Sequence, residues 1–209
     1  MNFFIRYLWE NPRFFIASFV IVVLSICCHE FAHAKVALLE GDSTAADNGH
    51  LTFNPFKQMG LWSLVTFALI GIAWGQVPVN PANFRRKYSD AIVSAAGPLT
   101  NLVLGFIFGG LMFLCAKMGI GDKFALNMLF MGGVINVVMA ILNLLPIPGF
   151  DGWNILLNFK PGLFRKNSEW IKGSFLVMTI LVFVFIGVLF QIGKFVIRAE
   201  LNLLGRFWG

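Results

Sequence analysis

The sequence predicts an all-α polytopic membrane protein with about four transmembrane helices, a re-entrant segment after the first and an amphipathic C-terminal helix. Of its 209 residues, 58% are hydrophobic and only 12% are charged, and the mean hydropathy is +0.78. A soluble domain of this size needs more charged residues to cover its surface. In addition, several stretches reach the roughly 20 mainly apolar residues that cross a bilayer. Composition and stretch length therefore both indicate a chain folded within a membrane.

Polar or proline-containing connections separate the expected spans, which are residues 14–38, 91–116, 126–145 and 174–193. Another apolar stretch, 61–75, is shorter, and stretches of that length are often interfacial or re-entrant. Residues 194–209 alternate apolar and charged side chains, which suits a helix lying in the membrane interface. We expect one domain over residues 1–209, with its core at 14–152, an additional helix at 174–193 and the amphipathic segment at 194–209.

The net charge of +6 comes from basic residues spread through the short connections, where they can meet lipid headgroups. No basic stripe interleaved with exposed aromatic residues is present, so a nucleic-acid partner is not expected. The three cysteines, Cys27, Cys28 and Cys115, lie in apolar runs and form no CxxC pattern. They are typical of small buried side chains rather than of metal ligands or disulfide partners.

The strongest chemical signal is the run His29-Glu30-Phe31-Ala32-His33, near the end of the first expected span. On a helix, positions i and i+4 share a face, so the two imidazoles point toward one spot. That spacing suits a zinc ion, and Glu30 lies beside it to accept a proton from a bound water. In a soluble helix, two surface histidines would be a strong alternative. Inside an apolar helix, ionisable residues are costly and are usually functional.

A catalytic zinc commonly has three protein ligands and a water, so the two histidines leave one ligand to be found. Asp151 is the candidate, because Pro146 and Pro148 end the preceding helix shortly before it. Freed backbone at membrane depth is tolerated where it lines a cavity. Asp151 could instead cap the helix that starts at Gly152. Since the histidine pair needs a third ligand, we favour the metal role.

These motifs resemble the site-2 protease family of intramembrane zinc metalloproteases. HExxH on a membrane helix is followed by a match to the pattern NxxPxxxxDG at residues 143–152. Further matches in the family's order are GDSTA at 41–45, GHLTFNP at 49–55, PVNP at 78–81 and AGPLTN at 96–101. The resemblance covers most of residues 29–152 and is nearest to small prokaryotic-type members without a PDZ or CBS domain. The chain departs from the family's pattern at one place. Where relatives often carry His-x-Asp, it has Lys57, Gln58 and Met59.

The resemblance implies that His29, His33 and Asp151 bind one zinc ion and that Glu30 is the general base. The implied activity is that of a metalloendopeptidase that hydrolyses peptide bonds within or next to transmembrane segments. Its nucleophile would be a zinc-bound water activated by the glutamate. From the residues alone, another divalent metal in place of zinc stays an open alternative.

The resemblance also brings Asn101 and Asn143 near the metal, where either could donate to the developing oxyanion or orient the substrate. Interhelical hydrogen bonding is the alternative for both asparagines. The implied partners are the lipid bilayer and single-span or signal-peptide-like membrane proteins, cut in regulated intramembrane proteolysis, and a homo-oligomer stays open. The implied location is a bacterial or archaeal cell (inner) membrane, with the active site nearer the cytoplasmic side.

The depths of the motifs constrain the topology. HExxH lies near the end of the first span, residues 97–101 near the start of the next long one, and Asp151 just past the end of the third. All three can meet at one metal only if the chain crosses the membrane an even number of times between Leu38 and Ala91. The stretch 61–75 should therefore dip into the membrane and return. A slight excess of basic residues on the site side agrees with a cytoplasm-facing site.

Two other classes of function are compatible with the same residues. A zinc-binding membrane scaffold or chaperone is one, although a purely metal-binding role does not need the carboxylate of Glu30. A small transporter with a cation path through buried His and Asp side chains is the other, although transporters often show duplicated halves and none is visible here. The remaining histidine, His50, lies in the polar connection 41–55 and is expected to be a solvated loop residue.

Overall fold

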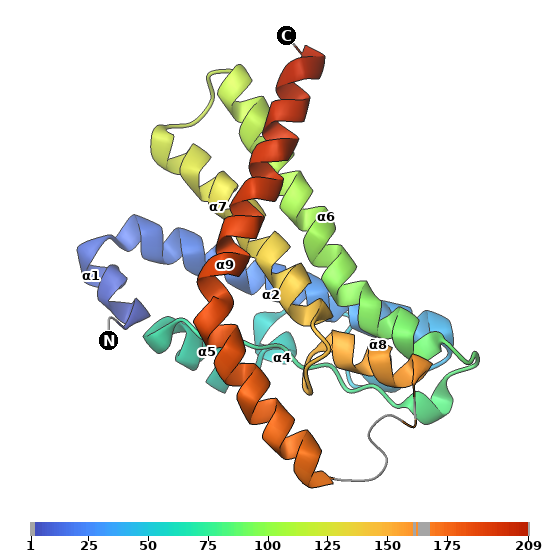
Figure 1. The fold of residues 1–209 in the computed structure, drawn as a ribbon. Helices are drawn as coiled ribbons and strands as arrows, with labels where there is room; N and C mark the ends of the chain where they lie inside the picture. The colour runs from blue at the N-terminus through green and yellow to red at the C-terminus, as the bar shows by residue number, and fades with distance from the viewer. Residues whose placement is uncertain (1–2, 161, 163–167, 209) are drawn as a thin grey trace.

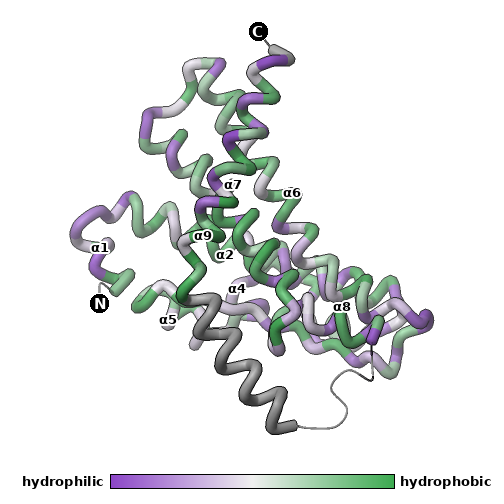
Figure 2. The backbone as a smooth tube through the Cα atoms, viewed as in Figure 1, coloured by the Kyte–Doolittle hydropathy of each residue, from purple (hydrophilic) through white to green (hydrophobic). Residues whose placement is uncertain are grey.

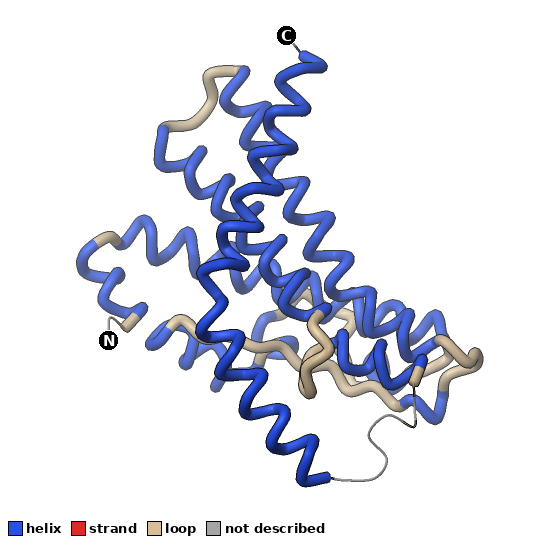
Figure 3. Tube along the Cα trace, in the orientation of Figure 1, coloured by secondary structure: helices blue, strands red, loops and turns tan. Residues whose placement is uncertain are grey.

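Long helices that cross one another make up most of the computed structural model, which describes residues 3–160, 162 and 168–208 (Figure 1). They are α2 (Pro12–Glu40), α6 (Ser89–Lys117), α7 (Lys123–Leu144) and α9 (Ser168–Trp208). The shorter elements are η1 (Phe4–Arg6), α1 (Tyr7–Glu10), α3 (Thr44–Asp47), α4 (Pro55–Gln58), α5 (Gly60–Ile70), η2 (Pro81–Asn83) and α8 (Asp151–Phe159). Since no strand occurs among the described residues, the expected all-α class is confirmed for them (Figure 3).

Three of the expected spans are present as long apolar helices. Each of α2, α6 and α7 is long and apolar enough to cross a membrane. Figure 2 shows hydrophobic residues along these helices and hydrophilic residues gathered in many of the connections. The fourth expected span, 174–193, belongs to α9, but side chains at positions 163–183 lie outside the described part of the structure. The described helices therefore fit a membrane protein with at least the first three expected spans.

The last helix differs from expectation because α9 continues without a break from Ser168 to Trp208. The sequence suggested two elements, a span at 174–193 and an interfacial segment at 194–209. In the structure, Ile197 is fully buried against Val134 and Val138 of α7. Gly193, at the expected boundary, lies so close to α7 that an added Cβ would come 3.0 Å from the Val134 carbonyl oxygen. Packing against α7 therefore keeps the two halves in one helix.

Small residues bring α6 and α7 close together. A Cβ added at Gly105 of α6 would lie 3.0 Å from a Val137 methyl and 3.3 Å from the Gly133 carbonyl oxygen of α7. Such small-residue interfaces are typical of membrane helices, where close backbone approach supplies van der Waals attraction in place of a hydrophobic driving force. The close pairing aligns the start of α6 with the end of α7, and both of these ends reach the candidate site.

Two sequence signals end the helices near that site. α2 ends at Gly41, whose φ of 109° is left-handed and is readily adopted by glycine. α7 ends at Leu144, and the next residue, Leu145, is extended with ψ of 137°. That conformation is favoured before Pro146, because the proline ring disfavours a helical residue in front of it. Both termini therefore follow from local sequence.

The stretch between α4 and η2 leads away from α4 as the helix α5 and comes back as an extended chain. α5 ends at Gly71, and residues 71–80, here called the returning segment, have no helical structure (Figure 3). The Gln76 amide donates to the Gln58 carbonyl oxygen at 3.0 Å, so the two ends of the stretch meet. Midway, Ser63 exchanges two hydrogen bonds with the backbone of Trp74, at 2.6 and 2.9 Å. The returning segment is thus fastened along α5.

The carboxylate of Asp42 fastens the other end of the returning segment. It is fully buried and accepts hydrogen bonds from the Asn80 amide at 2.7 Å and from the Asn83 side chain at 2.8 Å. It also accepts the Thr44 amide and hydroxyl, at 3.1 and 2.5 Å. Burial raises the pKa of Asp42, but the hydrogen bonds from Thr44, Asn80 and Asn83 outweigh it and lower the pKa below its ordinary value. The ionised form is therefore part of the fold.

We expect Asp42→Asn to lower the thermal unfolding midpoint in detergent by about 5 °C at pH 7, because the amide weakens four hydrogen bonds. Since the folded-state pKa is depressed, the contribution of the carboxylate is complete above about pH 4 and is lost as the pH falls through that pKa. The gap between wild type and variant should shrink near pH 3. Asp47→Asn, which changes an exposed carboxylate on α3, is the matched control. An equal gap at both pH values would contradict this role.

Candidate metal centre

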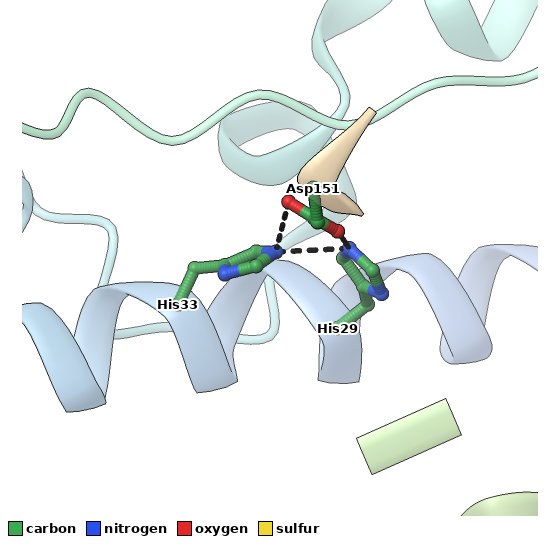
Figure 4. A group of neighbouring side chains, drawn as sticks. All are labelled: His29, His33 and Asp151. Atoms are coloured by element: carbon green, nitrogen blue, oxygen red, sulfur yellow. Dashed lines mark hydrogen bonds and ion pairs between the residues drawn. The ribbon is translucent and has the colours of Figure 1, made fainter. Parts of the chain in front are cut away.

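The HExxH histidines and Asp151 converge at the centre of the molecule. His29 and His33 lie one turn apart on α2, and their Nε2 atoms are 3.0 Å apart. The Asp151 carboxylate faces both, with Oδ2 at 3.2 Å from His29 Nε2 and Oδ1 at 3.3 Å from His33 Nε2 (Figure 4). Both histidines are buried, and Asp151 is partly buried. The structure thus brings together the three residues expected to bind the metal.

The start of α8 positions Asp151. The N-cap position is Phe150, and Asp151 is the first helical residue, so its carboxylate does not cap α8. Gly152 lies against the end of α7, where an added Cβ would overlap the carbonyl group of Leu144. A side chain at that position would push α8 away from α7. The close approach at Gly152 therefore sets the distance between Asp151 and the histidines.

Hydrogen bonds on the far side of each ring orient the two histidines. His29 Nδ1 donates to Asn101 Oδ1 at 2.5 Å, and His33 Nδ1 donates to the Val93 carbonyl oxygen at 2.8 Å. The amide of Asn101 is oriented by its own network, since its Nδ2 donates to Asn136 Oδ1 at 2.9 Å. With Nδ1 protonated, a neutral imidazole directs the Nε2 lone pair inward. Two such lone pairs and a carboxylate converge, and this arrangement attracts a cation.

The residues present fit a zinc ion. Ligand atoms about 2.0–2.1 Å from a tetrahedral zinc lie about 3.3 Å from one another. The two Nε2 atoms are 3.0 Å apart, and each has a different Asp151 oxygen at 3.2 or 3.3 Å, so the observed separations are close to that value. Asp151 Oδ2 is buried and makes no hydrogen bond of normal geometry. Burial raises the pKa of Asp151, but interactions with His29 and His33 outweigh it and lower the pKa to about 2. The carboxylate is therefore ionised, as a metal ligand must be.

Glu30 lies in the same cavity as the three candidate ligands. Its side chain is only 8% exposed, and it lines the cavity together with His29, His33 and Asp151. The returning segment crosses next to it, because a Cβ added at Gly75 would overlap the Glu30 carboxylate. A buried carboxylate in this position can exchange a proton with a molecule held in the cavity.

The cavity has a volume of about 480 Å³ and lies among four helices and the returning segment. Its walls come from α2, α6, α7 and α8, and residues 73–77 and 79 cover the remaining side. Gly97 of α6 contacts the histidine pair, and any side chain there would overlap both imidazole rings. A volume of this size accommodates a few residues of an extended peptide, and the polar lining can hold water.

The two expected asparagines lie in different surroundings. Asn143 lines the cavity, and its Nδ2 donates to the Met139 carbonyl oxygen at 3.0 Å. Asn101 is fully buried, does not line the cavity and uses its amide for His29, Asn136 and the Ser25 carbonyl oxygen. Its geometry matches the interhelical hydrogen-bonding alternative, because its amide is bonded to neighbouring helices and does not line the cavity.

Sequence reasoning missed the polar partners behind Asn101. Asn136 of α7 is fully buried, and its Nδ2 donates to Ser25 Oγ at 2.8 Å and to the Gly132 carbonyl oxygen at 2.9 Å. Ser25 lies on α2 one turn before His29, and its hydroxyl donates to the Ile21 carbonyl oxygen at 2.7 Å. One signal could have found Asn136, namely an amide side chain in the middle of an apolar span.

Two further expectations can be compared with the structure. Cys27 packs in an apolar cluster with Ile26, Met59 and Leu64, which agrees with its expected role as a small buried side chain. Cys28 and Cys115 are partly buried. Neither belongs to the candidate metal group found among the described residues. His50 lies in a loop, as expected, but is half-buried, and its Nδ1 donates a hydrogen bond to Gln58 Oε1 at 3.2 Å.

Gln58 lies in the segment where the chain departs from the motifs of the family that it resembles. Its side chain is 1% exposed and donates to the carbonyl oxygens of His50 and Thr52, at 2.8 and 2.6 Å. Its backbone carbonyl accepts the Gln76 amide. The residue therefore joins the polar connection after α3 to the returning segment. It lies in a side pocket with His50 and Lys57, apart from the histidine pair.

Several known proteins are similar to this chain. It is 33% identical to "Putative zinc metalloprotease YwhC" of Bacillus subtilis over 170 residues, which are 78% of this chain and 78% of that protein. It is 32% identical to "Putative zinc metalloprotease Rip2" of Mycolicibacterium smegmatis, over 82% of this chain and 70% of that protein. "Putative zinc metalloprotease MJ0611" of Methanocaldococcus jannaschii is 29% identical over 73% of this chain and 77% of its own length.

No family model matches the chain, and no solved structure is significantly similar to it. The three relatives nevertheless carry the same description, and this chain covers more than two thirds of each of them. Their description agrees with the site geometry, in which two histidines and an aspartate face one another beside a buried glutamate. The chain therefore belongs to the family of zinc metalloproteases that these relatives represent, which its motifs identify as the site-2 proteases.

Proposed function

We propose that this protein is an intramembrane zinc metalloendopeptidase that hydrolyses peptide bonds within or next to transmembrane segments of membrane proteins. One observation carries the proposal. His29, His33 and Asp151 face one another in a cavity that also holds Glu30, and three apolar helices long enough to cross a membrane supply its walls. A site meant only to hold a metal does not need the carboxylate of Glu30 inside the same cavity.

His29 Nε2, His33 Nε2 and one carboxylate oxygen of Asp151 would hold one zinc ion. When bound, zinc supplies Lewis acidity, which polarises a peptide carbonyl and makes water acidic enough to attack at neutral pH. The Glu30 carboxylate accepts the proton of the attacking water and returns it to the leaving nitrogen. Glu30 is buried and lines the same cavity as the histidine pair, so its carboxylate lies within the space that the attacking water would occupy.

The two asparagines would serve the reaction in different ways. Asn143 lines the cavity, and one of its two amide hydrogens is free of the Met139 bond and can donate to an oxyanion. Asn101 lies behind His29 and holds the ring with Nε2 directed into the cavity. It is therefore proposed as a positioning residue rather than as a catalytic one. Partners of this kind hold the tautomer and orientation of metal-binding histidines.

The returning segment would receive the substrate. A transmembrane helix shields its own peptide bonds, so it must unwind locally before it can be cut. Residues 73–77 and 79 line the cavity beside Glu30, and this stretch is extended without being part of a sheet. An extended edge of this kind can pair with an unwound substrate strand. The hydrogen bond between Gln76 and Gln58 supports a stretch that enters the membrane and returns to the same side.

The setting proposed for this reaction is a bacterial or archaeal cell membrane, with the site nearer the cytoplasmic side. Single-span or signal-peptide-like membrane proteins are the proposed substrates, and the reaction would serve regulated intramembrane proteolysis. The slight excess of basic residues on the site side supports this orientation. A non-catalytic metal-binding scaffold stays the second candidate function. The two candidates differ in whether Glu30 is needed, because only a protease uses its carboxylate in a reaction.

The central prediction concerns Glu30→Gln. We expect the variant to bind one zinc ion per chain, as the wild type does, and to cleave a reconstituted single-span substrate at least about 100-fold more slowly, because the amide accepts no proton. Metal content is measured by elemental analysis and cleavage by gel shift of the product. Equal cleavage by both forms would exclude the proposed role of Glu30. Full metal binding without cleavage of a broad substrate panel by wild type would favour the scaffold.

The two asparagines should respond differently to the same substitution. Asn101→Leu should weaken zinc binding by about 10–100-fold, because His29 loses its orienting partner. Asn143→Leu should leave zinc affinity nearly unchanged and lower kcat, because it removes a donor from the cavity. Competition with a chelator measures the affinity, and thermal unfolding of the metal-free proteins checks the fold. Equal losses of zinc affinity in both variants would contradict the positioning role.

The re-entrant path can be tested by labelling. Single cysteines replacing the exposed residues Lys57 and Gln76 should react with a membrane-impermeant thiol reagent from the same side of intact vesicles, because their segments adjoin. The native cysteines are changed to serine or alanine first, and a cysteine at Lys117, at the far end of α6, reports the opposite side. Labelling of positions 57 and 76 from opposite sides would exclude the re-entrant path.

A further inference from the structure

Asp90 is the carboxylate in the cavity that the proposed chemistry does not use. The lining includes three carboxylates, those of Glu30, Asp90 and Asp151, and it includes no lysine or arginine. Glu30 and Asp151 belong to the group of residues around the histidine pair. Asp90 belongs to the first turn of α6, at the other end of the same cavity. The cavity therefore has a second acidic position, remote from the histidines.

The geometry of α6 gives the distance between these two positions. Asp90, Ser94 and Gly97 follow the spacing i, i+4, i+7 and share one face of the helix. Gly97 contacts both imidazole rings, while Asp90 and Ser94 line the cavity. The seven residues from Asp90 to Gly97, at about 1.5 Å each, correspond to about 10 Å along the helix axis. Asp90 thus lies about 10 Å from the histidine pair, toward the start of α6.

α8 encloses this end of the cavity and is fastened to α6. Asn154, one turn after Asp151, also lines the cavity. Further along, the Asn158 side chain donates to the Lys87 carbonyl oxygen at 3.1 Å, and the rings of Tyr88 and Phe159 stack at 5.4 Å. The start of α6 and the end of α8 are therefore held together. Asp90 and Asn154 thus line the cavity from two helices that contact each other directly.

Asp90 has no partner of its own in the described part of the chain. It is half-buried, and no hydrogen bond or ion pair to its carboxylate occurs among the described residues. Two of the three bases at positions 85–87 have partners elsewhere. Arg86 pairs with Glu40, and the Lys87 ammonium lies 5.2 Å from the centre of the Tyr88 ring. A half-buried carboxylate without a partner is costly, and a cation that enters the cavity would offset that cost.

We propose that Asp90, assisted by Asn154, is a subsite for a lysine or arginine side chain of the substrate. This inference rests on the proposed protease function and adds a specificity to it. An extended peptide advances about 3.3 Å per residue, so about 10 Å corresponds to about three residues from the bond that is cut. Basic residues are enriched just outside transmembrane segments on the cytoplasmic side. A basic residue bound at Asp90 would direct cleavage to a bond slightly inside the membrane boundary.

The test uses single-span substrates that carry Lys, Gln or Glu at one position, three residues from the cleaved bond. The position before the bond and the position after it are varied in separate sets. The wild type should cleave the Lys version with a kcat/KM about fivefold higher than the Gln version, and the Glu version should be poorest. Asp90→Asn should lose the preference for Lys, so that the Lys and Gln versions are cleaved with the same kcat/KM. Asp90→Lys should reverse the order of the Lys and Glu versions. Asp47 is exposed and does not line the cavity, so Asp47→Asn removes the same charge and should keep the wild-type order.

Binding to the Glu30→Gln protein separates this inference from the proposed function. That variant, with and without Asp90→Asn, is titrated with the same three substrates, and the Lys version should bind about fivefold tighter only when Asp90 is present. Cleavage with equal rates for Lys and Gln versions would overturn the subsite and leave the protease standing. Absence of cleavage together with an Asp90-dependent preference in binding would overturn the protease and support the subsite. Equal binding of all three versions would overturn the subsite whatever the cleavage result.

Discussion

The orientation of two imidazole rings is the constraint on which the rest of the site depends. Both Nδ1 atoms donate to oxygens on α6, the side chain of Asn101 and the backbone of Val93. Both Nε2 atoms are thereby directed at one point, which the Asp151 carboxylate also faces. If either ring rotated, its lone pair would leave that point and the remaining groups could not bind a metal with the same geometry. α6 is thus as necessary to the centre as the helix that carries the histidines.

Polar groups buried behind the histidines make this orientation stable. Asn101, Asn136 and Ser25 come from three different helices and satisfy one another through a chain of hydrogen bonds. In an apolar surrounding each unsatisfied amide would cost several kcal/mol, so such a network either forms completely or is unfavourable. Its completion requires that α2, α6 and α7 pack in one register. The same network therefore specifies the helix arrangement and sets the tautomer of His29.

The sequence predicted the chemistry of this site better than its supports, for physical reasons. His29, Glu30 and His33 lie within a single turn, so helical periodicity alone brings them together. Asp151 could be added because two prolines end α7 just before it. By contrast, the contacts of Asn101 and of Gln58 depend on which helix faces which, and local pattern does not contain that information. The unbroken course of α9 was missed for the same reason, since it depends on packing against α7.

The position of the centre along its helices bears on how the proposed hydrolysis would occur inside an apolar bundle. From His33 to the end of α2 at Glu40 is about two turns, or about 10 Å, and Gly97 lies a similar distance from the start of α6. The histidines thus lie well inside the helices, while the helix ends meet polar connections. The cavity spans this depth, and its wall near the helix ends includes Asp90 and Asn154. Under the proposed function, water would reach the histidines along that polar wall while α2, α6 and α7 turn apolar surfaces toward the lipid. A metal bound there would lie at membrane depth without being sealed from water.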